Sequence, residues 1–130
     1  MYGCHIQPEQ MFNLIFGYNG AYIDQKSNLN ASEGPNWLYG NVVPVGEVWV
    51  ITAMRGINLN RTTEILLGSY DGTTISAVQD CVQPSISASV VWSGMMVLPA
   101  GYKTIAGFIS CQAGDDIYFD IHGYKMKVSQ

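Results

Sequence analysis

After residue 40, apolar residues occur in short runs that are separated by segments rich in Gly, Pro or Asn. In several of these runs the apolar residues alternate with polar ones. This period of two is typical of β-strands, and nothing after residue 40 has the periodicity of a helix of ten or more residues. We therefore expect strands at 37–43, 47–55, 64–70, 74–79, 86–98, 104–112, 115–122 and 124–128. Several short strands at this spacing predict an all-β fold, a sandwich or a barrel of about eight strands.

Three segments share one pattern directly before an apolar run: "VPVG" at 43–46, "LPAG" at 98–101 and "CQAG" at 111–114. Glycine adopts the positive φ that a chain reversal needs, so each segment predicts a turn that starts a strand at a corner of a sheet. A fourth segment, "YDGT" at 70–73, has the Asp-Gly pair of a tight hairpin and indicates that strands 64–70 and 74–79 are neighbours. None of these segments has the lysine and following helix of a phosphate-binding loop.

Alternation within the strands predicts which side chains are buried. We expect the core to contain Trp92, Ile117, Phe119 and Ile121. The pattern changes at Gly123, which predicts a β-bulge there, with Lys125 and Lys127 directed outward beyond it.

Strand 47–55 is apolar on both faces, unlike a sheet that has solvent on one side. Trp49 and Ile51 share one of these faces. We expect one of the two faces to be covered, either by residues 1–40 or by another copy of the chain, and we place Trp49 and Ile51 at this interface.

Residues 1–40 differ from the rest, and we divide the chain into an arm or loop region at 1–40 and a β-sandwich domain at 41–130. "YNGAY" at 18–22 contains an Asn-Gly turn signal, and the polar stretch 24–36 predicts a long loop. One apolar block lies before them: Met11, Phe12, Leu14, Ile15 and Phe16. This block either docks on a neighbouring copy or another protein, or forms the first strand of the sandwich.

Composition excludes some classes of function. Charged residues make up 12% of the chain, the net charge is −4, and the six basic residues are scattered, which argues against nucleic-acid binding through phosphate contacts. No apolar run approaches the roughly 20 residues of a membrane-spanning helix, and no secretion signal is visible, so we expect folding in a cytoplasm. The odd number of cysteines, three, argues against a disulfide framework.

Candidate chemistry is sparse. The sequence has none of the common catalytic or cofactor-binding motifs, and we expect no catalytic residue and no cofactor. Asp116, Asp120 and His122 would share a strand face, which makes them weak candidates for a divalent-cation site, against a simpler interpretation as a solvated face. The many Trp and Tyr residues fit either core and interface packing or stacking against sugar rings.

Three stretches together resemble a known family: "VPVGEVWVITAM", "LLGSYDGTT" and "VVWSGMMVLPAGYKTIAGFISCQAGDDIYFDIHGYKM". They are similar to a recurring small β-sandwich of tailed-bacteriophage virions, and the similarity covers about two-thirds of the chain, residues 42–128. The resemblance implies a jelly-roll-like antiparallel sandwich in a virion assembled in the host cytoplasm.

The resemblance also implies a function without catalysis. The first expectation is a capsid decoration (cement) protein, a homotrimer that stabilises the shell through contacts with the major capsid protein or other virion proteins. The alternative is a receptor- or glycan-binding module of a phage tail or head fibre.

Overall fold

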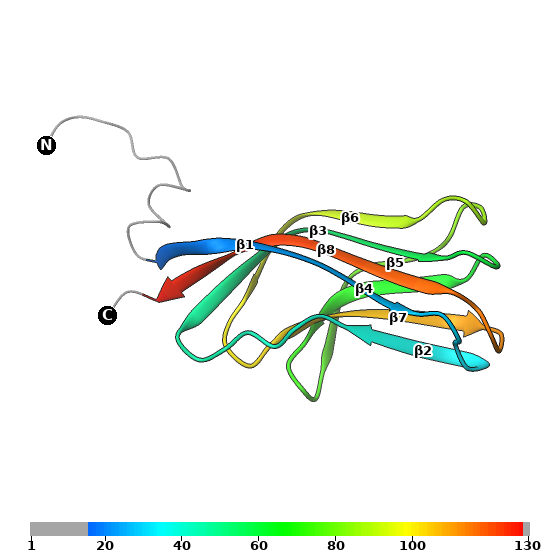
Figure 1. The fold of residues 1–130 in the computed structure, drawn as a ribbon, viewed down its shortest axis with the longest axis horizontal. Coiled ribbons are helices and arrows are strands. Elements are labelled where there is room, and N and C mark those ends of the chain that lie inside the picture. The colour runs from blue at the N-terminus through cyan, green and yellow to red at the C-terminus, as the bar shows by residue number, and fades with distance from the viewer. Residues whose placement is uncertain (1–15, 129–130) are drawn as a thin grey trace, which may run out of the picture.

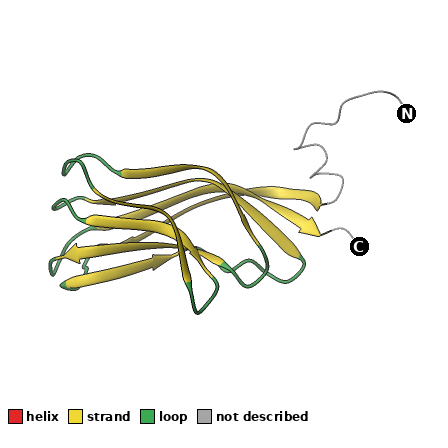
Figure 2. Cartoon of the chain, turned by 180° about the vertical axis from the view of Figure 1, so that it is seen from behind, coloured by secondary structure: helices red, strands yellow, loops and turns green. Residues whose placement is uncertain are grey.

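A computed structural model describes residues 16–128 of the chain, and every regular element in this range is a strand (Figure 1). Eight antiparallel strands form two four-stranded sheets that pack face to face, which confirms the predicted all-β sandwich (Figure 2). Sheet A has the order β1-β8-β3-β6 and sheet B the order β2-β7-β4-β5. The strands are β1 (Phe16–Asn28), β2 (Gly34–Tyr39), β3 (Glu47–Asn58), β4 (Glu64–Tyr70), β5 (Ile75–Val82), β6 (Val90–Leu98), β7 (Lys103–Cys111) and β8 (Ile117–Val128).

The strand pairing is that of a jelly roll. The first strand pairs with the last, the second with the seventh, the third with the sixth and the fourth with the fifth. Such pairing results when one long antiparallel ribbon, closed by the β4–β5 hairpin, folds over on itself into two layers. Two further pairings, β3 with β8 and β4 with β7, complete the sheets.

The three predicted corner turns are confirmed. The third residue of each turn is a glycine with positive φ: Gly46 at 86°, Gly101 at 90° and Gly114 at 89°. The carbonyl of the first residue accepts a hydrogen bond from the amide of the fourth: Pro44 from Glu47 at 3.2 Å, Pro99 from Tyr102 at 3.2 Å and Gln112 from Asp115 at 3.1 Å. This is the arrangement of a type II turn, which needs glycine at its third position.

The predicted Asp-Gly hairpin is confirmed as the link between β4 and β5. Gly72 has a φ of 100°, and Oδ1 of Asp71 accepts hydrogen bonds from the amides of Thr73 at 2.8 Å and Thr74 at 2.7 Å. The aspartate therefore satisfies two backbone donors that the sharp reversal leaves unpaired.

The beginning of the described chain differs from its prediction. Residues 16–28 form one long strand, β1, that pairs with β8, so the predicted loop at 24–36 is limited to the short connection between β1 and β2. Asn19 and Gly20 form no hairpin turn: the register shifts between Tyr18 and Ala21, and Gly20 has a φ of 113°. Asn-Gly favours positive φ in a bulge as well as in a turn, and β1 is polar because it lies at the edge of sheet A.

The bulge predicted at Gly123 is misplaced. Strand β8 continues through Gly123, and the extra residue lies in the facing strand β3, where the register shifts between Ile51 and Ala53. Odd-numbered residues of β8 therefore keep facing sheet B to the end of the strand. Contrary to the prediction, Lys125 lies over the indole of Trp49, with its Nζ 5.0 Å from the ring centroid.

The core between the sheets contains Ile117, Phe119 and Ile121, all 0% exposed, as predicted. Trp92 is half-buried and packs against this cluster. Trp49 and Ile51, which the sequence analysis placed at an interface, are buried in the same core. Trp49 and Ile51 are therefore not available for contact with another molecule, and any contact surface is formed by exposed side chains elsewhere on the sandwich.

Candidate interaction surfaces

The outer face of sheet A carries large apolar side chains. Paired residues of antiparallel strands share a face, so the register shows which side chains point away from sheet B. Five of them are about half exposed or more: Ile23 69%, Met95 66%, Tyr18 62%, Val91 55% and Val97 49%. The solvent face of an antiparallel sheet is ordinarily polar, so this face resembles a contact surface.

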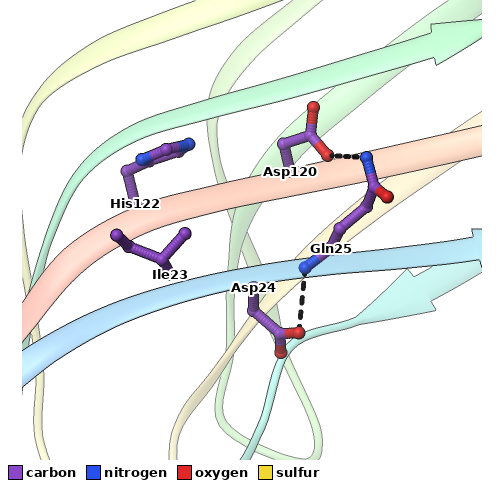
Figure 3. Close-up of a pocket in the computed structure, with 5 residues that line it drawn as sticks. All are labelled: Ile23, Asp24, Gln25, Asp120 and His122. Carbon is purple, nitrogen blue, oxygen red and sulfur yellow. Dashed lines mark hydrogen bonds between the residues drawn. The ribbon is translucent and has the colours of Figure 1, made fainter.

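A shallow hollow lies on this face, where β1 and β8 run side by side (Figure 3). It is lined by Ile23, Asp24, Gln25, Asp120 and His122, and an adjoining hollow reaches Ala53, Arg55 and Val91. Both carboxylate oxygens of Asp120 have partners: Gln25 Nε2 donates to Oδ1 at 2.7 Å, and Arg55 Nε donates to Oδ2 at 2.8 Å. The charge of Asp120 is thus neutralised within the face.

The structure does not bring the three weak metal candidates together. Asp120 and His122 point outward from β8, whereas Asp116 precedes the strand, where its amide donates to Oδ1 of Asn60 at 2.7 Å. Within residues 16–128 no group of three or more His, Cys, Asp or Glu side chains could hold a metal ion. The same part of the chain has no helix long and apolar enough to cross a membrane.

The ion pair between the buried Asp115 and Arg61 was not predicted from the sequence. Asp115 is 1% exposed, and Arg61 donates to both of its oxygens, from Nε at 2.7 Å and from Nη2 at 2.9 Å. Asn58 Nδ2 and the amide of Gln112 each donate to Oδ2 at 2.9 Å. The hydrogen bonds from Arg61, and to a smaller extent those from Asn58 and Gln112, together lower the pKa of Asp115 to about 2 against the opposing effect of burial.

This ion pair is structural. It ties the end of β3 and the β3–β4 loop to the turn before β8, and the Asp115 carbonyl accepts a further hydrogen bond from the Ala31 amide at 3.0 Å. Both oxygens of the carboxylate are occupied by protein donors, which leaves the group saturated and unsuited to proton transfer. Only the Gly-Asp pair at 114–115 was visible in the sequence, and it gave no indication of the arginine partner.

A second surface lies on the outer face of sheet B and is aromatic. Trp37 and Tyr39 on β2 are each 38% exposed. The rings of Tyr39 and Tyr70 lie 5.8 Å apart, and Nζ of Lys103 lies 4.2 Å from the centroid of Tyr39 and 5.6 Å from that of Tyr70. The outer face of sheet A thus exposes mainly aliphatic side chains together with Tyr18, whereas that of sheet B exposes Trp37 and Tyr39.

The predicted interface block at Met11, Phe12, Leu14 and Ile15 lies outside the described residues. Phe16 is the first residue of β1, where its backbone pairs with Val128 at the end of β8. The block is therefore connected directly to the edge of sheet A.

Comparison with known proteins does not identify a family. No protein-family model matches the chain, and no curated protein matches it. Among solved structures, it is similar to the Drosophila NLP core, a structure described as giving insight into pentamer formation and histone binding, with a TM-score of 0.38 and 15% identity over 84% of this chain and 100% of that one. It is also similar to the N-terminal cellulose-binding domain of Cellulomonas fimi β-1,4-glucanase C, with a TM-score of 0.31 and 15% identity over 86% of this chain and 80% of that one. Likeness at this level carries no conclusion about function.

Proposed function

We propose that the chain is a non-catalytic structural protein of a tailed-bacteriophage virion, a capsid decoration protein that attaches to the major capsid protein or another virion protein through the outer face of sheet A. The five exposed apolar side chains on that face carry the proposal. The virion location comes from the sequence resemblance of residues 42–128, and the jelly-roll strand order is compatible with it.

The energetics of the face favour contact with a protein. Full burial of one large apolar side chain contributes about 1.5–3 kcal/mol, so covering five that are half exposed or more contributes on the order of 5 kcal/mol. The Arg55–Asp120 pair can be covered without leaving an unpaired charge, because each group already has its partner on the same face. The exposed apolar side chains and the charges that are already paired both lower the free-energy cost of removing this face from water.

The N-terminal region adds a second element to the proposal. The apolar block at 11–16 leads into the edge of sheet A, and we assign it contacts with a neighbouring copy in a homotrimer or with the underlying shell. The oligomeric state rests on the sequence resemblance alone, and light scattering tests it.

A binding assay with matched variants tests the role of sheet A. Particles of the phage that encodes the chain, assembled without it, are incubated with purified protein and separated by sedimentation. Met95→Asp places a charge on sheet A, and Val82→Asp places one at a similarly exposed position of sheet B, where Val82 is 60% exposed. The proposal predicts that the wild type and Val82→Asp bind and that Met95→Asp does not. Equal binding of both variants, or no binding of the wild type, contradicts it.

A further inference from the structure

Trp37 lies across the backbone of the neighbouring strand. It pairs with Gly107 of β7, and a Cβ atom on that glycine would overlap three atoms of the indole ring, Cζ3, Cε3 and Cη2. The missing side chain at Gly107 thus allows the ring to rest on the sheet. Because Trp37 is still 38% exposed, the ring is supported from below and accessible from the solvent.

The residues beside Trp37 extend this platform and hold it in place. Tyr39 lies two residues further along β2 on the same face, about 7 Å away. Its ring packs beside that of Tyr70, and the Lys103 ammonium group lies over it. A platform of aromatic side chains that already have their packing partners loses little conformational freedom when a ligand binds.

Two acidic side chains lie on the same outer face, on the other side of Gly107. Register places Leu66 beside Gly107, Asp80 beside Leu66, and Glu64 diagonal to Asp80. The neighbouring carboxyl group of Asp80 raises the pKa of Glu64. Neither forms a salt bridge within residues 16–128.

These features select one class of ligand. The face of an aromatic ring is electron-rich and attracts the polarised C–H groups of a sugar ring, while carboxylates accept hydrogen bonds from hydroxyl groups. The same carboxylates repel phosphate and sulfate groups, so the face disfavours nucleic acids and sulfated glycans. Gly107 and Asp80 are two strand spacings apart, about 10 Å, which is a span of more than one sugar unit.

We propose that the outer face of sheet B binds a neutral oligosaccharide, with one sugar ring stacked on Trp37 and hydroxyl groups of the next units donated to Asp80 and Glu64. This inference does not depend on the proposed function. Sheet A and sheet B are opposite layers of the sandwich (Figure 1), so a protein attached by sheet A presents sheet B to the surroundings.

Titration with defined glycans tests the proposal. The probes are cellohexaose, maltohexaose, chitohexaose and mannohexaose, with a heparin hexasaccharide as the sulfated comparison, followed by NMR and by tryptophan fluorescence. We expect at least one neutral hexasaccharide to bind and the heparin fragment not to bind. Trp37→Ala should weaken binding about tenfold, as expected for the loss of one stacking contact. Asp80→Asn should weaken it less.

The matched control is Tyr18→Ala, which removes an exposed aromatic side chain from sheet A. It should leave glycan binding unchanged. Trp37→Phe retains a smaller ring and should bind with intermediate affinity, which separates stacking from any folding defect of Trp37→Ala. The proposal is overturned if none of the neutral hexasaccharides binds, if Trp37→Ala binds as well as the wild type, or if Tyr18→Ala weakens binding equally.

Discussion

Replacing Asp115 by Asn tests how far one buried carboxylate stabilises the loops at its end of the sandwich. The substitution keeps the shape of the side chain and removes its charge, so Arg61 loses its ionic partner while the Asn58 donor keeps an oxygen to bind. The Arg61 hydrogen bonds, the largest influence, hold the pKa of Asp115 at about 2 in the folded protein, against an ordinary value of 3.8.

This pKa difference sets the magnitude and the pH range of the effect. A carboxyl group with a lowered pKa stabilises the folded state fully at pH values above its unfolded-state pKa, and the contribution disappears as the pH falls through the folded-state pKa. For Asp115 the linkage corresponds to about 2 kcal/mol at neutral pH. The contribution is expected to decrease as the pH falls from about 4 to about 2, because the unfolded chain binds a proton at this carboxyl group while the folded protein keeps it ionised. Below about pH 2 both states are protonated and the contribution is lost.

Urea unfolding followed by tryptophan fluorescence measures this effect directly. At pH 7 we expect the free energy of unfolding of Asp115→Asn to be about 2 kcal/mol lower than that of the wild type, and we expect this difference to approach zero near pH 2. Asp116→Asn is the control, since it removes the same charge from a neighbouring carboxylate that forms no salt bridge within residues 16–128. A difference that stays constant from pH 7 to pH 2.5, or an equal loss in Asp116→Asn, would refute the reasoning.

Three further predictions concern the core, the platform and self-association. Phe119→Ala should lower the free energy of unfolding by about 3–5 kcal/mol, because Phe119 is 0% exposed; a loss below about 1 kcal/mol in a urea titration would show that it does not lie in the core. Gly107→Ala should displace the indole of Trp37 and increase its quenching by acrylamide; unchanged quenching would mean that the ring does not rest on this glycine. Light scattering at micromolar concentration should show a trimer, and a monomer at all concentrations up to 100 µM would remove the homotrimer from the proposed function.

Local features of the fold were predictable because their causes are local. Gly46, Gly101 and Gly114 stand where a type II turn needs positive φ, and this requirement depends on four consecutive residues. The burial of Ile117, Phe119 and Ile121 followed from alternation along one strand. Such signals do not depend on which strand is the neighbour.

Features that depend on the neighbouring strand were missed. The position of a bulge is a property of two strands, and the glycine at 123 gave no sign that the extra residue lies opposite it, at Thr52 of β3. The sequence of strand β1 predicts a turn and a loop, because edge strands are polar and its pairing partner β8 lies at the other end of the sequence.

The candidate sites were predictable only in part, for the same reason. Asp115 and Arg61 are 54 positions apart, and Trp37 and Gly107 meet only through the pairing of β2 with β7. The sequence indicated aromatic side chains that could bind sugars or pack in the core. It could not indicate which of them a glycine would support on the outer face of a sheet.

The proposed virion function is tested most directly by a cryo-electron-microscopy reconstruction of particles produced from the genome that encodes the chain. We predict many copies distributed over the shell, each with the outer face of sheet A, including Tyr18, Val91 and Met95, against the capsid and with Trp37 on sheet B facing outward. A particle that lacks the protein, or that carries it with the apolar face of sheet A exposed to solvent, would contradict the proposed function.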